Sequence, residues 1–533
     1  MRHWWEDAVF YQIYPRSFMD SNGDGLGDLA GIADRLDHLA DLGIDAIWLT
    51  PFFPSPDKDF GYDVSNYRSV DPRFGDLSGF TRLVCEARKR GIRVVLDLVA
   101  NHSSDEHPWF LAARSSRADP LHDWYLWAPE KRRPPNNWKA CFELGTAWHR
   151  NPATRERYLG TFTRHQPEFD WRNPAVRRAF HDVMRFWFDL GADGFRLDVA
   201  TAYAKDGRLR SNPLSLNAVP DFFQRHLYDR NRPEFHGYFR EMRSVADAAG
   251  ERLLVGEPYG GDPRLAASCY GERGDELHMA FDFDFTRSPW NARAFRAAAE
   301  RWYAALPEGA WPCFTLSNHD LPRHAWRYGR GSRPVMEARA RVAAAVLLAI
   351  RGTPFLYYGE EIGMSCFRIP RNRLSDPVGV RTWPLGFLGR DPERTPMQWD
   401  SSNNAGFSEA EPWLPVNPDY RERNVSSQAA DPGSLLSWYR KLTGLRRARP
   451  ELREGALQFL DLDAEVLAWE RTLPGQPGRV LVLLNFASRP VDARIPASAA
   501  VLAGTHREEG SRIQPGALAL APSEAVIADC PPT

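Results

Sequence analysis

The first 450 residues of the chain alternate short apolar runs with longer amphipathic stretches. The runs predict eight strands, at residues 9–14, 46–49, 94–98, 194–198, 253–257, 280–285, 313–316 and 354–357. The stretches carry apolar residues at helical spacing and predict helices at 29–42, 77–90, 175–190, 220–249, 292–304, 335–349 and 434–448. Repeated strand–helix units predict a parallel sheet, and eight of them favour a closed (β/α)8 TIM barrel.

Two irregular stretches interrupt this pattern. Residues 101–172 lack helix-length periodicity and are rich in Pro, Trp and His, which predicts an inserted loop-rich subdomain. A second insertion covers about 364–431; long insertions in compact domains usually shape a binding site. Short alternating strands after residue 450 predict a C-terminal antiparallel β-sandwich domain. We therefore divide the chain into a barrel (1–100 and 173–450), an inserted subdomain (101–172) and a C-terminal β domain (451–533).

Composition excludes several classes of protein. The charges of the 68 basic and 69 acidic residues nearly cancel, so no polyanionic partner and no nucleic acid is expected to bind. The strongest apolar run, 342–350, is too short to span a bilayer, so no membrane association is expected. Six scattered cysteines suggest neither a zinc ribbon nor a disulfide framework and favour a reducing compartment. Because acidic residues stand where a signal peptide would be apolar, we expect a cytoplasmic protein.

Carboxylates and histidines follow several of the predicted strands. The third strand continues through Asp97 to His102, the fourth ends in Arg196 and Asp198, the fifth in Glu257, and the seventh runs into His319 and Asp320. In a barrel these strand ends meet at one rim, where active sites lie. Three carboxylates converging there would raise one another's pKa, which is typical of acid and base catalysis.

A glycosidase needs such a pair of carboxyl groups. One is protonated and donates to the leaving oxygen, and the other is ionised and acts as base or nucleophile. Arg196 stands two residues before Asp198 and shares its strand face, so we expect it to keep Asp198 ionised. Neighbouring carboxylates and partial burial would raise the pKa of Glu257.

These blocks resemble those of the α-amylase superfamily of glycoside hydrolases (family 13), within it the α-glucosidase and oligo-1,6-glucosidase group. The resemblance covers nearly the whole chain, and its four blocks stand in the family's order at 97–102, 194–198, 256–257 and 317–320. It implies that Asp198 is the nucleophile, Glu257 the general acid/base, and Asp320 the carboxylate that stabilises the transition state.

The same resemblance implies a pocket for a terminal glucose. Residues matching positions that bind the sugar ring or orient the nucleophile are Asp63, His102, Arg196, His319 and Arg394, and matching wall residues are Tyr62, Phe142, Phe162 and Gln166. No His pair has the spacing of a zinc site. The block 166–170 reads Gln-Pro-Glu-Phe-Asp and resembles the one that marks the oligo-1,6-glucosidase group, usually Gln-Pro-Asp-Leu-Asn.

Indications about linkage conflict. In this group a Val directly after the nucleophile accompanies α-1,6 selectivity, which is what Val199 suggests. The segment 374–379 and the loop before Arg394 instead resemble bacterial α-1,4-acting glucosidases, and Glu257-Pro258 lacks the Glu-Met of typical oligo-1,6-glucosidases. The linkage therefore stays open between α-1,4 and α-1,6.

An acidic loop near the N-terminus places oxygen ligands at alternate positions, like the start of an EF-hand loop whose closing acidic residue is missing. The family carries a structural divalent ion there, so the resemblance implies Ca²⁺ (or Mg²⁺) held by Asp20, Asn22, Asp24, Asp28 and the Leu26 carbonyl. An Asx-turn loop without metal is the alternative. Neither a dinucleotide fingerprint nor a Walker loop is present, so no nucleotide or organic cofactor is expected.

Three functions fit these observations. The first is a retaining, exo-acting α-glucosidase that cleaves a small oligosaccharide or glucoside. The second is a glucosyl-transferring or isomerising enzyme of the trehalose synthase or sucrose isomerase type. The third, a non-catalytic binding protein, is disfavoured because Asp198, Glu257 and Asp320 are all present. The segments 199–213 and 394–399 favour the α-glucosidase, and the sequence leaves the oligomeric state open.

Overall fold

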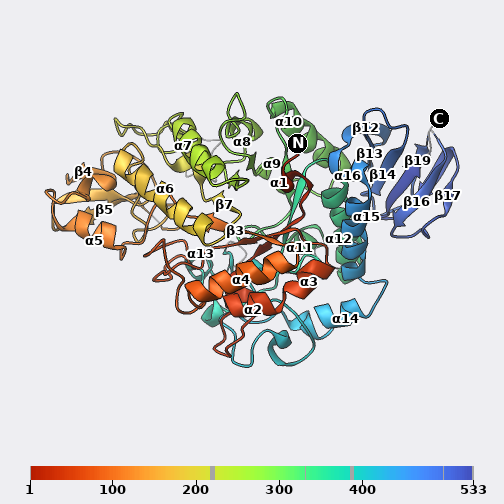
Figure 1. Cartoon of the computed structure of the whole chain (residues 1–533), viewed down its shortest axis with the longest axis horizontal. Coiled ribbons are helices and arrows are strands. Elements are labelled where there is room, and N and C mark those ends of the chain that lie inside the picture. Colours follow the sequence, from red (N-terminus) through yellow and green to blue (C-terminus); the bar gives the residue numbers. More distant parts are fainter. Residues whose placement is uncertain are drawn as a thin grey trace.

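A parallel eight-stranded sheet, nearly closed into a barrel, forms the centre of the computed structural model (Figure 1). The structure describes residues 2–143, 145–215, 223–329, 332–384, 389–495 and 497–530. The barrel strands, in their spatial order, are β10 (Cys313–Thr315), β11 (Thr353–Tyr357), β1 (Phe10–Ile13), β2 (Ala46–Leu49), β3 (Arg93–Leu98), β7 (Gly194–Leu197), β8 (Leu253–Gly256) and β9 (Met279–Ala280). A single parallel bridge between Phe281 and Cys313 joins the two ends of this order. The predicted barrel is thus confirmed.

Alternation along the strands separates two layers of apolar packing. Phe10, Trp48 and Phe355 belong to a cluster inside the barrel, where Phe10 and Phe355 stack with centroids 4.3 Å apart. The neighbours Tyr11 and Ile47 face outward and join the larger cluster between strands and helices. Because both faces are buried, the strands read as continuous apolar runs, which is why the sequence reveals them.

Helices surround the barrel and follow its strands. Those of the barrel and its loops are α1 (Trp4–Asp7), α2 (Leu29–Asp34), α3 (Leu36–Asp41), α4 (Leu77–Lys89), α6 (Pro174–Asp189), α7 (Phe235–Ala248), α8 (Pro263–Ser268), α9 (Phe283–Thr286), α10 (Ala292–Ala305), α11 (His324–Gly329), α12 (Arg333–Ala349), α13 (Pro377–Arg381), α14 (Val425–Ala429), α15 (Leu435–Ala448) and α16 (Pro450–Glu454). No helix in the ranges given above is long and apolar enough to cross a membrane.

Three predicted elements differ in the structure. The helix expected at 29–42 is split into α2 and α3, because the backbone leaves helical geometry at Arg35. The helix expected at 220–249 begins only at Phe235, after Pro233, which disfavours helix at the residue before it; residues 220–222 lie outside the described part. The strand expected at 280–285 ends at Ala280, and α9 follows because the Asp282 carboxylate accepts from the Asp284 and Phe285 N–H groups.

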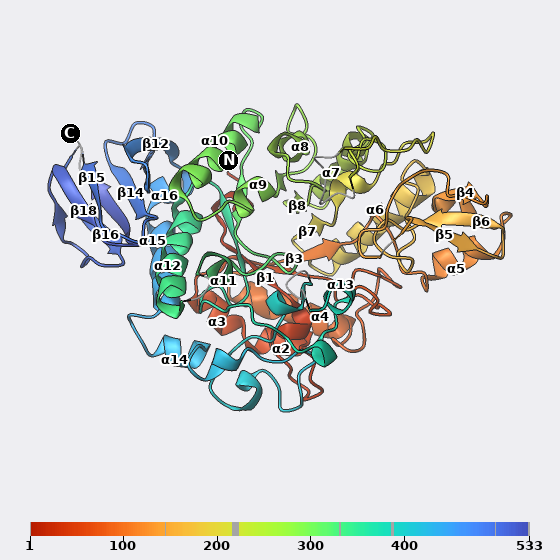
Figure 2. The same cartoon turned by 180° about the vertical axis from the view of Figure 1, so that it is seen from behind.

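The insertion between β3 and β7 contains more regular structure than the sequence suggests. It holds α5 (Pro108–Ser115) and a three-stranded antiparallel sheet of β4 (Trp127–Pro129), β6 (Glu156–Leu159) and β5 (Trp148–Asn151). The sheet packs against a separate apolar cluster, which includes Trp138 and Trp148. The sheet lies at the opposite end of the molecule from the C-terminal domain (Figures 1 and 2).

The C-terminal domain consists of two antiparallel sheets, as predicted. The larger contains β12 (Ala456–Asp463), β13 (Val466–Thr472), β14 (Arg479–Asn485), β19 (Ala525–Cys530), β16 (Ala499–Gly504) and β17 (Arg512–Ile513), and the smaller pairs β15 (Val491–Ile495) with β18 (Gly516–Leu520). Side chains of both sheets form one core, which includes Leu483, Val491 and Leu520. The domain docks on the barrel through contacts such as Trp290, whose Nε1 donates to the Phe486 carbonyl.

Candidate active site

A cavity of about 760 Å³ opens at the carboxyl ends of the barrel strands. Eight of the predicted site residues line it: Tyr62, His102, Phe142, Phe162, Asp198, Val199, Glu257 and Asp320. Four others, Gln166, Arg196, His319 and Arg394, are fully buried behind the lining residues and contact them. A cavity of this size with a few converging polar groups is typical of a small-molecule site.

One guanidinium connects the carboxylates at the cavity base. Arg196 Nη1 lies 2.7 Å from Asp97 Oδ1 and 2.7 Å from Asp198 Oδ1, and Nη2 lies 2.5 Å from Glu257 Oε2. The sheet register makes this possible, because Asp97 on β3 pairs with Arg196 on β7. Asp198 and Glu257 directly follow neighbouring strands, and the Glu257 N–H donates to the Leu197 carbonyl at 3.0 Å.

Electrostatics at this cluster favours retention of a proton. Burial, with Glu257 and Asp97 nearby, raises the pKa of Asp198 well above its ordinary value, although Arg196 opposes the shift. Burial likewise raises the pKa of Asp97. Arg196 thus acts in the expected direction, but one positive charge does not offset burial and two neighbouring carboxylates. The pKa values of both aspartates that contact Arg196 Nη1 are therefore raised.

Asp320 has the opposite environment. Burial would raise its pKa, but His319, Arg394 and Arg390 together lower it well below the ordinary value. Arg394 Nη2 lies 2.7 Å from Asp320 Oδ1, and His319 Nε2 lies 3.1 Å from Oδ2. His319 also lies 2.7 Å from the Tyr62 hydroxyl, which donates to Asp97 Oδ2 at 3.0 Å. Asp320 is thus held as an anion, whereas the pKa of Asp198 is raised.

The structure corrects the prediction for Asp63. Its side chain is fully buried outside the cavity lining, and its carboxylate accepts from the Ser55 hydroxyl and from the Lys58 and Asp59 N–H groups. Burial raises the Asp63 pKa to about 6. The carboxylate that lines the cavity is Asp59, four residues earlier. Asp63 therefore shapes the loop that presents Asp59, because these three hydrogen bonds come from residues four to eight positions earlier in the same loop.

Asp59 is held by two partners. Its Oδ1 lies 2.6 Å from Arg390 Nη2, and its Oδ2 accepts from Gln166 Nε2 at 3.0 Å. Arg390 also pairs with Asp376 at 2.8 Å and reaches Asp320 at 3.4 Å. These ion pairs connect the loop after β2 with the insertion at 364–431.

His102 is a neutral member of the same wall. Its Nε2 lies 2.9 Å from the Tyr62 carbonyl, and its Nδ1 lies 3.2 Å from Asn101 Nδ2. Burial lowers the pKa of His102 to about 4, so the ring is uncharged near neutral pH and can offer one N–H and one acceptor. Phe142 and Phe162, with ring centroids 5.8 Å apart, cover the neighbouring apolar surface.

Val199 connects the two acidic strand ends through its backbone. Its N–H donates to Glu257 Oε2 at 3.2 Å. The residue has φ 36° and ψ 44°, a left-handed conformation that β-branched residues rarely adopt. Such strain is characteristic of functional sites, where the surrounding structure holds it in place. Its side chain packs with Phe162 and Ala202 at the cavity wall.

The predicted metal ligands lie in one loop before α2. The Asp20 carboxylate accepts from the Asn22, Gly23 and Gly25 N–H groups, and Asp28 caps α2 through the Gly31 N–H. The Asn22 side chain accepts from the Asp24 N–H, and the Asp24 carboxylate accepts from the Leu26 N–H. The oxygen donors suit Ca²⁺ or Mg²⁺ in chemistry. However, no group of three or more His, Cys, Asp or Glu side chains among the described residues is placed to hold a metal ion.

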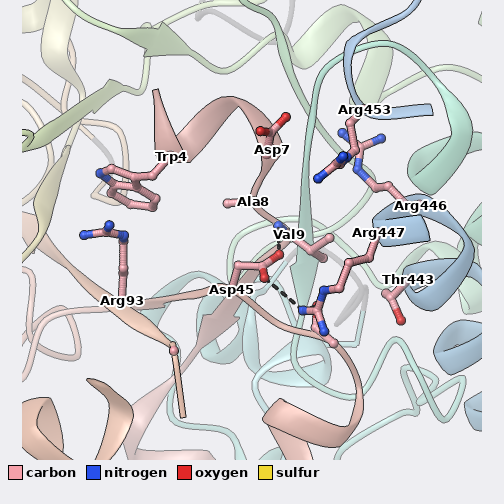
Figure 3. Close-up of a pocket in the computed structure, with 12 residues that line it drawn as sticks. Trp4, Asp7, Ala8, Val9, Asp45, Arg93, Thr443, Arg446, Arg447 and Arg453 are labelled. Atoms are coloured by element: carbon pink, nitrogen blue, oxygen red, sulfur yellow. Dashed lines mark hydrogen bonds and ion pairs between the residues drawn. The ribbon is translucent and has the colours of Figure 1, made fainter. Parts of the chain in front are cut away.

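A second cavity, of about 240 Å³, lies at the opposite end of the barrel (Figure 3). Its charged groups form structural contacts: Arg447 Nη2 donates to Asp45 Oδ1 at 2.9 Å, and Asp45 Oδ2 accepts from the Val9 N–H at 2.9 Å. Arg93 stacks on Trp4, with its guanidinium carbon 4.6 Å from the ring centroid. These contacts hold the N-terminal ends of β1 to β3, the face that serves stability in TIM barrels.

Sequence reasoning assigned no role to several residues of the site. Asp59 and Arg390 lie in loops without periodicity. Their place in the site is seen only from the ion pairs that Arg390 forms with Asp59 and Asp376 in the structure. Asp97 is the first residue of the block 97–102. The alternation of side chains along β3 could have placed it inside the barrel. Tyr259 and Phe283 also line the cavity and carried no signal beyond their aromatic type.

Comparisons with known proteins identify the family of the chain. The family model for the α-amylase catalytic domain matches residues 12–455. A probable α-glucosidase of Rhizobium meliloti (strain 1021) is 42% identical over 93% of this chain and 91% of its own length. An oligo-1,6-glucosidase of Parageobacillus thermoglucosidasius is 37% identical over 93% and 92% of the two chains.

A solved structure has the same fold over its full length. The trehalulose synthase of Pseudomonas mesoacidophila MX-45 superposes with a TM-score of 0.91 and 35% identity, covering 99% of this chain and 100% of that one. Family model, relatives and fold all agree with the barrel. The chain therefore belongs to the α-amylase family of glycoside hydrolases, within its α-glucosidase and oligo-1,6-glucosidase group.

Proposed function

We propose that the protein is a retaining, exo-acting α-glucosidase that releases glucose from the non-reducing end of short α-glucosides. The observation that carries the proposal is the contact of one guanidinium with both Asp198 and Glu257 at the base of the cavity. Two carboxyl groups on neighbouring nitrogens of Arg196 are held close together, as a double displacement requires.

In this mechanism Asp198 attacks the anomeric carbon as Glu257 gives its proton to the glycosidic oxygen, so the aglycone leaves and a glucosyl ester forms. Glu257 then removes a proton from water, which attacks the anomeric carbon and releases glucose and the Asp198 carboxylate. Asp320, held anionic by its basic neighbours, accepts hydrogen bonds from sugar hydroxyls and favours the positive charge that develops on the ring.

Exo action is supported by the groups beside Asp59. Arg390 ties Asp59, Asp376 and Asp320 together, and its guanidinium carbon lies 4.4 Å from the Phe142 ring centroid. A rigid wall of this kind would stop a chain from extending beyond its terminal sugar, while Asp59 and His102 contact its hydroxyls.

Glucosyl transfer or isomerisation is the second candidate. It is favoured by the close fold similarity to a trehalulose synthase. It differs from hydrolysis only in which acceptor, sugar or water, attacks the glucosyl enzyme. A cytoplasmic location remains part of the proposal, because the six cysteines are scattered along the sequence without the close spacing of a disulfide framework.

The loop at 20–28 is proposed to bind one Ca²⁺ or Mg²⁺ through Asp20, Asn22, Asp24, Asp28 and the Leu26 carbonyl. The ion would be structural, since the loop lies outside the cavity lining. It would add ionic cross-links to a loop that its own backbone hydrogen bonds already shape.

Asp198→Ala should lower kcat on maltose, isomaltose and sucrose by about 10⁴-fold, because covalent catalysis is lost. The fold should persist, since Asp97 and Glu257 still pair with Arg196. Initial rates and product analysis check this, with the exposed Asp492→Ala as control. Substantial residual turnover by Asp198→Ala would contradict the nucleophile assignment. With the unmodified protein, release of β-glucose would contradict retention, and new disaccharides exceeding free glucose at low substrate would favour transfer.

Asp59→Asn should lower kcat/KM by about 10- to 100-fold, because the charge pair with Arg390 at the cavity is lost. Asp63→Asn should instead lower the free energy of unfolding by about 1–3 kcal/mol. An Asn side chain has only one acceptor oxygen, so it cannot accept all the hydrogen bonds from Ser55, Lys58 and Asp59. Kinetics and urea denaturation of both variants distinguish the roles. The reverse pattern would return the sugar contact to Asp63.

Val199→Thr should shift the ratio of maltose to isomaltose turnover several-fold toward maltose, if Val199 sets the linkage preference. Thr has the same branched shape, so the left-handed backbone is equally strained and only the polarity of the wall changes. Val378→Thr, another cavity valine, serves as the control. An unchanged ratio in Val199→Thr would show that other residues decide the linkage.

Removing divalent ions with a chelator should lower the melting temperature, and added Ca²⁺ should restore it. An ion at 100 times its Kd would stabilise by about 2.7 kcal/mol. The variant Asp24→Ala should lose the response, because it removes one of the proposed ligands. Identical melting curves with chelator and with Ca²⁺ would support the metal-free Asx-turn loop.

A further inference from the structure

The cavity has a side that must face the leaving group. A general acid delivers its proton to the glycosidic oxygen, so residues next to Glu257 flank the aglycone. The segment 258–261 directly follows Glu257 and lines the cavity together with Phe283 and Arg287. We call residues 258–261, 283 and 287 the aglycone wall.

Charges elsewhere in the cavity are compensated. Asp198 and Glu257 share Arg196, while Asp59 and Asp320 contact Arg390. Arg287, on the aglycone wall, forms no ion pair with an acidic side chain in the described part of the chain. Its guanidinium carbon lies 5.6 Å from the Phe283 ring centroid, and the residue is exposed. Arg230 also lines the cavity, and its guanidinium carbon lies 4.4 Å from the Tyr259 ring centroid.

The backbone after Glu257 leaves room for this guanidinium. A Cβ on Gly261 would lie 3.3 Å from Arg287 Nη1, so a larger residue there would crowd the charged group. Gly260 has φ +150°, a conformation that L side chains rarely adopt. Two glycines therefore let Arg287 lie against the chain four residues beyond the proposed general acid, at the place where an aglycone would sit.

We propose that the protein prefers α-glucosides whose aglycone carries a carboxylate, which Arg287 binds. This inference rests on the α-glucosidase function proposed above and names its substrate class. A planar guanidinium matches a carboxylate with two parallel hydrogen bonds, which the neutral hydroxyls of a second sugar cannot reproduce. A monoanion is favoured over a phosphate dianion, because the carboxylates deeper in the cavity repel the second charge more strongly.

The test compares two aryl glucosides that differ in charge: 4-carboxyphenyl and 4-carbamoylphenyl α-D-glucopyranoside. The ratio of their kcat/KM values is measured for the unmodified protein, Arg287→Gln, Arg287→Lys and the control Arg293→Gln, an exposed arginine on α10. Comparing ratios between proteins cancels the intrinsic difference between the two leaving groups. For a partly exposed pair we expect Arg287→Gln to lower the ratio by about fivefold.

Lys at position 287 should keep part of the preference, and Arg293→Gln all of it. Raising the salt concentration to 1 M should lower the ratio in the unmodified protein and leave it unchanged in Arg287→Gln, because ions screen an exposed pair. Equal ratios in the unmodified protein and Arg287→Gln would overturn the proposal. If neither these glucosides nor maltose and isomaltose are cleaved, the α-glucosidase function itself fails. The ratio of the two binding constants, measured by calorimetry on the same proteins, then still decides the charge preference.

Discussion

Arg196 is the group on which the catalytic geometry depends. It is 1% exposed and faces three carboxylates from three strands, Asp97, Asp198 and Glu257. Each carboxylate alone would be costly to bury as an anion, and the guanidinium alone would be equally costly. Together they form a compact unit with an excess of negative charge, which contributes to the raised pKa values of Asp198 and Asp97. The barrel supplies the rigidity, because the register of β3, β7 and β8 places Arg196 beside Asp97, and Asp198 and Glu257 directly beyond the paired residues Leu197 and Gly256.

Around this unit the site is built from loops that anchor one another. Arg390 and Arg394 come from the long insertion after β11, and both reach Asp320 in the loop after β10. Asp59 comes from the loop after β2, and Gln166 from the inserted subdomain joins it at 3.0 Å. Segments that are distant in sequence thus become one wall, and its order depends on paired charges rather than on regular hydrogen-bond ladders.

The sequence was sufficient wherever chemistry follows regular structure. Asp198 and Glu257 could be placed because each directly follows a buried strand whose apolar run is visible. Asp59 and Asp63 could not be distinguished in this way, since both lie in one irregular loop and only their hydrogen-bond partners differ. The run at 280–285 was ambiguous for a related reason: an apolar segment of that length suits a strand or a helix, and the Asp282 cap decides. Strain at Val199 has no sequence signature.

The seam of the barrel has a consequence for how the site can vary. Strand β9 contains only two residues, and one bridge between Phe281 and Cys313 closes the circle. This is the sector with the fewest cross-strand hydrogen bonds, so local opening costs least there. Phe283 and Arg287 follow this seam in sequence, whereas Asp97 and Asp198 belong to or follow strands with four paired residues between them. Local opening of the barrel at this seam would let aglycones of different size enter the cavity while the reacting groups keep their positions.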